Sequence, residues 1–325
     1  MRVLFGRQRF TAELAWQDLR PLLPGWEIIT SPPRLVTEHL DGVDAVCPFG
    51  AWIDEAVLDA GTFGLVHQFG VGLEKVDIPR ATERGVWVSR VPGEAGGNAD
   101  SVAELAILHL LALVKRLDAA RSALAGGRWE SRPTGGSVLG ATVLIVGLGA
   151  IGTAVALRLV PFGARLLGVR ARPQLGGPPG MELVAGPDQV SELLSQADAV
   201  ICCAMLDSGT AGMFGAAQFG AMKRGALFVN VARGGLVDQA ALLAALESGQ
   251  VGGAGLDVHA AEPADPGSDL LRHPSVVATP HVGGLTDLMF ARTGAAFAEN
   301  LRRWADGGTP RWAVNAPAFR RRPPT

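Results

Sequence analysis

The chain has 325 residues, enough for two domains that each bury a core of their own. Lys and Arg number 29 against 31 Asp and Glu, so no basic surface indicates nucleic acid or an anionic membrane as a partner, and a small molecule is expected instead. Cys47, Cys202 and Cys203 lie in or beside apolar runs without the spacing of metal ligands. We expect buried free thiols in a reducing compartment and no metal site.

Two further features favour a cytoplasmic protein. The N-terminus lacks the apolar core of a signal peptide, because arginines interrupt its apolar residues. The longest apolar stretch, 105–114, is too short to span a bilayer.

Short apolar runs alternate with helical stretches before Pro92. They predict a small parallel sheet with crossover helices, with strands at 2–5, 26–30, 45–48, 65–69 and 86–88. One long amphipathic helix is predicted over 98–123, where Ser101 and Glu104 have capping-box spacing. This helix would lead the chain into a second domain, and 126–139 is predicted to be a loop.

Residues 141–172 predict a βαβ unit of dinucleotide-binding type. A strand at 141–146 precedes Gly147, Gly149 and Gly152, which form G-x-G-x-x-G, and a helix at 153–162 and a strand at 164–169 follow. The glycines suit a tight turn, close approach of a pyrophosphate and packing of helix on strand. Ala150 and Ile151 would offer N–H groups to the phosphates. The alternative is a glycine-rich turn that binds nothing.

Two arginines, Arg170 and Arg172, follow the second strand of this unit. An NAD site needs an acidic residue there to accept a hydrogen bond from the ribose 2′-OH. Guanidinium groups can instead bind a 2′-phosphate, so we expect NADP(H) to be preferred over NAD(H). The alternative is a solvated surface pair.

Beyond Arg172 the strand and helix alternation continues. The sequence predicts strands at 199–204, 226–231, 255–258 and 276–278, helices at 188–196 and 239–248, and a last helix at 286–305. The fold class is therefore α/β, with two Rossmann-like or flavodoxin-like domains, each a doubly wound parallel sheet, and a cleft between them. Residues 1–97 plus 284–325 would form the substrate-binding domain, and 98–283 a six- or seven-stranded dinucleotide-binding domain.

Three polar residues follow strands of the second domain: Arg233, Glu262 and His281. Because the carboxyl ends of parallel strands meet at one sheet edge, we expect these residues to converge there. Arginine can bind a carboxylate, histidine can move a hydroxyl proton during hydride transfer, and a carboxylate can orient that histidine. Taken singly, each residue also has an ordinary structural explanation: a salt-bridge arginine, a solvated turn glutamate or a packed loop histidine.

The chain resembles the D-isomer-specific 2-hydroxyacid dehydrogenase family over nearly its whole length. The matching stretches, in the family's order, are FGVGLEKVDIPRATERGVWVSRVPG (69–93), NADSVAELAILHLLALVKR (98–116), VGLGAIG (146–152), MKRGALFVNVARGGLVDQAALLAAL (222–246), GLDVHAAEP (255–263) and TPHVGG (279–284).

The resemblance implies roles for individual residues. Arg233 would bind the substrate carboxylate or oxo group, and Glu262 would be the partner of the acid/base His281. The N–H groups of Val71 and Gly72 would hold the carboxylate across the cleft, unless they form an ordinary glycine turn.

The same resemblance implies a nicotinamide pocket. Val231 and Ala232 would line it, and Gly283 and His281 would lie beside the cofactor. Asp257 would contact the carboxamide, unless it is a buried aspartate that caps the next loop.

Departures from the family's pattern refine this reading. NAD-type members carry Asp at the position of Arg170, so the chain resembles the NADPH-type glyoxylate and hydroxypyruvate reductase branch. Cys203 to Leu206 replaces a proline-containing run beside the adenosine, and 131–139 is short. Related formate dehydrogenases have Gln where Glu262 stands, which argues against that chemistry.

The expected activity is NADPH-dependent reduction of small 2-oxo acids, such as glyoxylate or hydroxypyruvate, to D-2-hydroxy acids. The family implies a homodimer, to which the loop bearing Trp129 points. The alternative is a dinucleotide-sensing, corepressor-like protein with little turnover, which would retain the same glycine turn.

Overall fold

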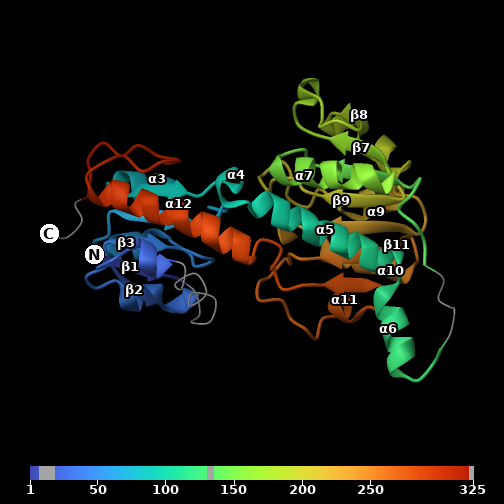
Figure 1. Cartoon of the computed structure of the whole chain (residues 1–325), viewed down its shortest axis with the longest axis horizontal. Helices are drawn as coiled ribbons and strands as arrows, with labels where there is room; N and C mark the ends of the chain where they lie inside the picture. Colours follow the sequence, from blue (N-terminus) through green and yellow to red (C-terminus); the bar gives the residue numbers. More distant parts are fainter. Residues whose placement is uncertain (7–18, 130–134, 322–325) are drawn as a thin grey trace. The chain divides into compact units, whose positions relative to one another are not determined.

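The computed structural model describes residues 1–6, 19–129 and 135–321 (Figure 1). The chain divides into two compact units: unit 1 comprises Met1–Asn98 and Leu285–Thr325, and unit 2 comprises Ala99–Gly284. Each unit is built on a parallel sheet, of five strands in unit 1 and seven in unit 2, with helices packed on it. The predicted α/β class with two parallel sheets is confirmed. Cys47, Cys202 and Cys203 are free thiols, and Cys203 is only partly buried.

The sheet of unit 1 has the order β2-β1-β3-β4-β5, in which the chain order reverses beside β1. Its strands are β1 (Arg2–Phe5), β2 (Glu27–Thr30), β3 (Ala45–Cys47), β4 (Leu65–Gln68) and β5 (Trp87–Arg90), all close to the predicted positions. Both faces of β1 are buried: Val3 and Phe5 belong to one apolar cluster and Leu4 to the other. Burial on both faces explains why these strands read as apolar runs rather than as alternating patterns.

Helices cover both faces of this sheet. They are η1 (Arg20–Leu22), η2 (Pro33–His39), α2 (Glu55–Ala60), α3 (Ile78–Glu83), α4 (Gly93–Gly96) and α12 (Asp287–Ala305). The predicted last helix is confirmed as α12, which begins where the Thr286 hydroxyl accepts a hydrogen bond from the Met289 N–H. Its buried side chains, among them Phe297 and Trp304, pack on the face that carries Phe5.

The prediction of one helix over 98–123 is wrong. The chain forms α5 (Asn98–Val114) and α6 (Leu117–Ala125), separated at Arg116, whose φ of 50° is left-handed (Figure 1). The predicted capping box is wrong as well. Ser101 lies buried inside α5, because the helix already begins at Asn98, after the left-handed Gly97.

The sheet of unit 2 has the order β12-β11-β10-β9-β6-β7-β8. Its strands are β6 (Thr142–Val146), β7 (Arg165–Val169), β8 (Met181–Ala185), β9 (Ala199–Cys202), β10 (Ala226–Asn230), β11 (Val251–Leu256) and β12 (Val276–Ala278). The chain order reverses between β6 and β9, the topological switch point at which such sheets bind ligands.

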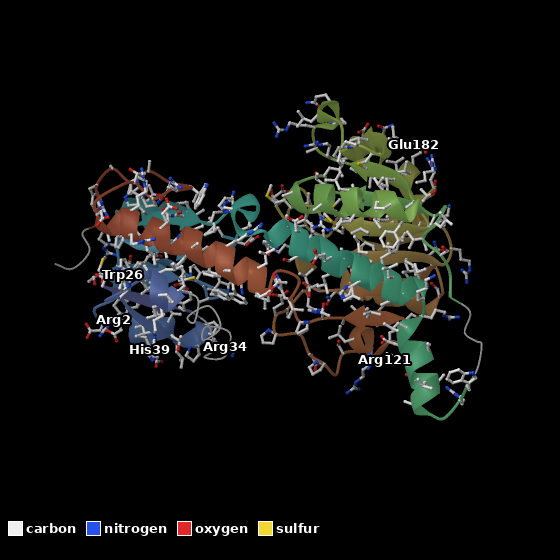
Figure 2. All side chains as sticks on the ribbon, viewed as in Figure 1. Arg2, Trp26, Arg34, His39, Arg121 and Glu182 are labelled. Carbon is white, nitrogen blue, oxygen red and sulfur yellow. The ribbon has the colours of Figure 1, made fainter. Side chains whose placement is uncertain are left out.

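Two strands of unit 2 differ from the prediction. The edge strand β8 was not among the predicted strands, because its outer side is exposed and carries Glu182 (Figure 2), which pairs with Arg165 of β7 at 2.7 Å. Strand β11 begins at Val251, four residues before the predicted start. Gly252 and Gly253 lack the side chains on which a strand pattern depends.

Helices also cover both faces of this second sheet. Besides α5 and α6, they are α7 (Ala150–Leu159), η3 (Val160–Phe162), η4 (Pro173–Leu175), η5 (Pro187–Gln189), α8 (Val190–Leu194), α9 (Ala216–Ala221), η6 (Gly234–Leu236), α10 (Gln239–Glu247) and α11 (Asp269–Arg272). Helices α5 and α7 share one apolar cluster, while α8, α9 and α10 pack on the opposite face. Helix α7 begins at Ala150 rather than at 153. Along the described residues, no helix is both long and apolar enough to cross a bilayer.

Candidate active site

The glycine turn between β6 and α7 is tightly packed at its first and third glycines. A Cβ on Gly147, whose φ is +100°, would lie 2.5 Å from the Ala204 nitrogen, and one on Gly152 would lie 2.0 Å from the Gly147 oxygen. A Cβ on Gly149 would meet nothing within 4 Å. The turn therefore leaves space at the position where a pyrophosphate would approach the backbone.

The N-terminus of α7 faces the same space. Gly149 is its N-cap and provides no side-chain cap. Ala150 and Ile151 lie in the first turn, where N–H groups have no acceptor within the helix. These free donors and the positive end of the helix dipole fit the phosphates of a dinucleotide.

Arg170 and Arg172 lie at the end of β7 in different surroundings. Arg170 is half-buried, and its Nη1 donates a hydrogen bond of 2.7 Å to the Gly176 carbonyl, which ties it to the turn after η4. Arg172 is exposed and is the N-cap residue of η4. Arg170 is therefore anchored, which sets it apart from a solvated arginine.

Arg233 follows β10 in a loop that buried groups hold in place. The side chain of Asn230, 1% exposed, accepts a hydrogen bond from the Ala232 N–H and donates one to the Arg233 carbonyl, both at 3.0 Å. A Cβ on Gly234 would lie 2.0 Å from the His259 backbone, so the loops after β10 and β11 are packed together. Val231 and Ala232 are buried below them.

Glu262 and His281 meet in the same unit. The His281 Nδ1 lies 2.8 Å from the Glu262 Oε2, and the two side chains are 46% and 35% exposed, with His281 the more exposed. In the described residues His281 makes this one side-chain hydrogen bond, so Nε2 remains for a substrate. Strands β10, β11 and β12 are neighbours in register, with Asn230 opposite Leu256 and Leu256 opposite Ala278. Arg233, Glu262 and His281 therefore follow three adjacent strands at one sheet edge.

The surroundings of Glu262 favour its ionised form. Partial burial opposes ionisation, but the hydrogen bond and the charge of His281 and the N–H of His259 outweigh burial, so the pKa of Glu262 is lowered. The His259 N–H donates to Oε1 at 3.2 Å, which leaves Oε2 for the histidine. Glu262 is thus a carboxylate held in position to stabilise a protonated His281.

Asp257 holds the loop that carries His281. Its carboxylate, 2% exposed, accepts hydrogen bonds from the Thr279 hydroxyl at 2.6 Å and from the N–H groups of Val282 and Gly283 at 2.9 Å. The buried, loop-capping aspartate is therefore present, and contact with a carboxamide stays a prediction. Thr279 and His109 also support this loop and were not predicted to do so. The signal for His109 was a histidine within an apolar helical run.

Val71 and Gly72 lie in unit 1, after β4. Their carbonyls accept hydrogen bonds from Arg90 Nη1 at 3.2 Å and from Gln68 Nε2 at 2.8 Å, respectively. Their N–H groups donate to no residue in the described part of the chain. The loop is thus fixed through its carbonyls, and two amide donors remain for an anion.

Comparisons with known proteins identify the family. Residues 107–283 match the model of the D-isomer specific 2-hydroxyacid dehydrogenase, NAD binding domain. A glyoxylate reductase of Korarchaeum cryptofilum is 34% identical over 309 residues, covering 90% of both chains. A D-3-phosphoglycerate dehydrogenase of Archaeoglobus fulgidus is 34% identical over 82% of this chain, which spans 50% of that relative's length.

The fold is also that of a solved structure. The TT0316 protein from Thermus thermophilus superposes with a TM-score of 0.84 at 32% identity, covering 97% of this chain and 100% of that one. The match of the family model over more than half of the chain and the near full-length relative confirm the resemblance found in the motifs. The chain belongs to the D-isomer-specific 2-hydroxyacid dehydrogenases, a family of NAD(P)-dependent oxidoreductases.

Proposed function

We propose that the protein reduces small 2-oxo acids, such as glyoxylate or hydroxypyruvate, to D-2-hydroxy acids with NADPH. The observation that carries this proposal is the His281–Glu262 pair at 2.8 Å, in the unit that also contains the glycine turn. The glyoxylate reductase relative supports the substrate class. In this proposal unit 2 binds the dinucleotide and unit 1 contributes to substrate binding.

His281 is the proposed proton donor. Nδ1 is engaged by Glu262, so the proton delivered to the substrate oxygen leaves from Nε2. Glu262 stabilises the imidazolium before transfer and orients the ring. The His259 N–H fixes the second carboxylate oxygen, which prevents Glu262 from turning away.

Arg233 and the amides of Val71 and Gly72 are the proposed ligands of the substrate carboxylate and oxo group. A guanidinium can bind a carboxylate through two parallel hydrogen bonds, and a pair of backbone donors adds directional contacts. Val231, Ala232, Asp257 and Gly283 would surround the nicotinamide. When bound, the reduced nicotinamide would supply the hydride for the carbonyl carbon.

The test is an absorbance assay of reduced nicotinamide consumption. A panel of 2-oxo acids, including glyoxylate, hydroxypyruvate and its 3-phosphate, is supplied with NADPH or NADH. We expect turnover of at least one acid and a loss of at least about a hundredfold in kcat for His281→Ala, with NADPH binding nearly intact. If reduced nicotinamide is consumed with none of the acids, a dinucleotide-sensing protein is favoured. If His281→Ala turns over as fast as the wild type, His281 has no part in the mechanism.

The preference for NADPH is part of the proposal. Arg170 and Arg172 support it, because a cationic strand end favours a 2′-phosphate and lacks the acidic residue that a ribose hydroxyl needs. Michaelis constants for the two cofactors with the same acid test it. A lower constant for NADPH is expected, and a clear preference for NADH would contradict it.

We further propose a cytoplasmic homodimer. Exposed apolar side chains on and after α6 support an interface there: Leu124 is 62%, Trp129 92% and Leu139 74% exposed. Light scattering behind size-exclusion chromatography should give twice the chain mass. A monomer at micromolar concentration would contradict this part of the proposal.

A further inference from the structure

A chain of buried hydrogen bonds leads from α5 to the loop that carries His281. The His109 Nε2 lies 3.2 Å from the Thr279 Oγ1, and that hydroxyl lies 2.6 Å from the Asp257 Oδ1. Asp257 in turn accepts the N–H groups of Val282 and Gly283, on the far side of His281. The loop is thus connected to a helix through side chains that, among the described residues, form no hydrogen bond with Glu262 or the His281 ring.

The direction of each hydrogen bond follows from the chemistry of the groups. A carboxylate only accepts hydrogen bonds, so the Thr279 hydroxyl donates its one proton to Asp257. The hydroxyl oxygen must then accept from His109, which requires the tautomer with the proton on Nε2. The His109 Nδ1 is buried and has no partner among the described residues, so it has no acceptor for an N–H of its own. Burial lowers the pKa of His109, although the charge of Asp257 opposes this, so the neutral ring is favoured.

The backbone is shaped to admit this histidine. A Cβ on Gly255 of β11 would lie 2.7 Å from the His109 Cβ, a distance that no side chain could occupy. His109 is 1% exposed, yet it is a polar residue in the apolar face that α5 presents to the sheet. Burying a polar side chain that has a single hydrogen-bond partner destabilises the folded protein. We therefore expect the one hydrogen bond of His109 to have a function.

Thr279 also connects His281 with His259, the residue whose N–H holds Glu262. Its carbonyl accepts from the His259 Nε2 at 3.0 Å and from the His281 N–H at 3.1 Å. The His259 N–H in turn holds Glu262. His281 has a left-handed φ of 55°, a conformation that is uncommon for residues other than glycine and that its surroundings must stabilise.

We infer that His109 and Thr279 are positioning residues, which hold His281 in its left-handed conformation against Glu262. This inference rests on the proposed function of His281. His109 acts on Thr279, Thr279 and Asp257 fix the loop on either side of His281, and the imidazole is thereby presented to the substrate. Neither residue touches substrate in this account.

Two pairs of variants test the inference. His109→Leu removes the donor, whereas the amide of His109→Gln can place an N–H near the former Nε2. Thr279→Val removes the hydroxyl at nearly constant volume, whereas Thr279→Ser keeps it. For the Leu and Val variants we expect kcat for 2-oxo acid reduction to fall about tenfold or more, with KM for NADPH within about twofold of wild type. The Gln and Ser variants should recover most of the loss.

Hydrogen–deuterium exchange provides a readout that needs no turnover. In His109→Leu and Thr279→Val we expect the N–H groups of Val282 and Gly283 to exchange at least about tenfold faster, and in the conservative variants to stay near wild type. If the wild type reduces no oxo acid, the proposed function fails, while the exchange rates still report on the loop.

Three results would overturn the inference. One is a kcat within about twofold of wild type in both His109→Leu and Thr279→Val. Another is a loss of kcat in His109→Gln and Thr279→Ser that equals the loss in His109→Leu and Thr279→Val. This would show that side-chain volume rather than hydrogen bonding matters. The third is a loss confined to KM for NADPH, which would make the network a support of the cofactor site. If His109→Leu does not fold, the Thr279 pair decides alone.

Discussion

The clearest test of the proposed proton donor is Glu262→Gln, which removes one charge and keeps the volume. Glu262 accepts from both His281 and the His259 N–H, but an amide has only one oxygen. Either the NH₂ group opposes the His259 N–H, or it faces His281 and favours a neutral ring. In either case the negative charge that stabilises the imidazolium needed for reduction is lost.

The expected magnitude follows from the geometry of the pair. A hydrogen bond between charged groups contributes about 1.5–3 kcal/mol when protected from solvent. Because the two side chains are 46% and 35% exposed, we discount this for screening to about 1–2 kcal/mol. At about 1.36 kcal/mol per factor of ten, kcat for the reduction should fall by about 5- to 30-fold near neutral pH.

The pH dependence distinguishes this mechanism from general damage. The pKa of Glu262 is lowered from 4.5 in the folded protein, so its carboxylate stays ionised above that value and is lost only on further acidification. The wild type therefore keeps the carboxylate ionised throughout the neutral range. As pH falls below 4.5 the wild type loses this carboxylate, whereas Glu262→Gln has none to lose, so the deficit should shrink there.

The assay is kcat against pH for glyoxylate or the best acid of the panel, with NADPH saturating. Glu247→Gln, an exposed glutamate at the end of α10, provides the same chemical change outside the site and should leave kcat unchanged. A Glu262→Gln variant within twofold of wild type over the whole range would refute the role given to Glu262.

Three further variants test other parts of the molecule, and a fourth tests stability against pH. Gly149→Ala should keep the melting temperature, because its Cβ meets nothing within 4 Å, but weaken NADPH binding measured by fluorescence about tenfold. Gly152→Ala should instead cost about 1–3 kcal/mol in urea unfolding, because its Cβ would lie 2.0 Å from a carbonyl oxygen; equal behaviour of the two would contradict the packing described. Arg172→Gln should raise KM for NADPH about tenfold and leave that for NADH unchanged, whereas equal effects would exclude contact with a 2′-phosphate. His67 is fully buried, and burial lowers its pKa from 6.5 to about 3 in the folded protein. As pH falls below 6.5, the unfolded chain binds a proton that the folded protein does not, so the protein loses stability. Between about pH 7 and 5 the wild type should lose about 2 kcal/mol more than His67→Phe, and equal losses would exclude this role.

The elements that could be predicted are those whose signal is local. The strand β1 and the helix α12 have uninterrupted apolar patterns, and both lie where expected. Strand β8 is an exposed edge strand, so burial leaves little trace in its sequence. The break between α5 and α6 falls at Arg116, whose left-handed conformation is one that apolar periodicity does not report.

The candidate site could be located for a different reason. In a parallel sheet the carboxyl ends of all strands share one edge, so the loops that follow adjacent strands start close together. This rule places Glu262 and His281 at the same edge, where the loops bring them to 2.8 Å. It says nothing about partners that come from the body of a helix, which is why His109 looks in the sequence like part of an apolar run.

His109 shows what kind of information is missing from such patterns. Helical periodicity specifies which face of α5 is buried, and a histidine on that face can equally be a packing residue or half of a hydrogen bond. The difference depends on Thr279, 170 residues further along the chain, and on the space left by Gly255. In the sequence alone, Gly255 looks like a residue that weakens a strand and His109 like a polar residue in an apolar helix face. Neither can be interpreted without the other. In the fold, Gly255 leaves the space that His109 occupies, and His109 supports the loop that carries the strained His281.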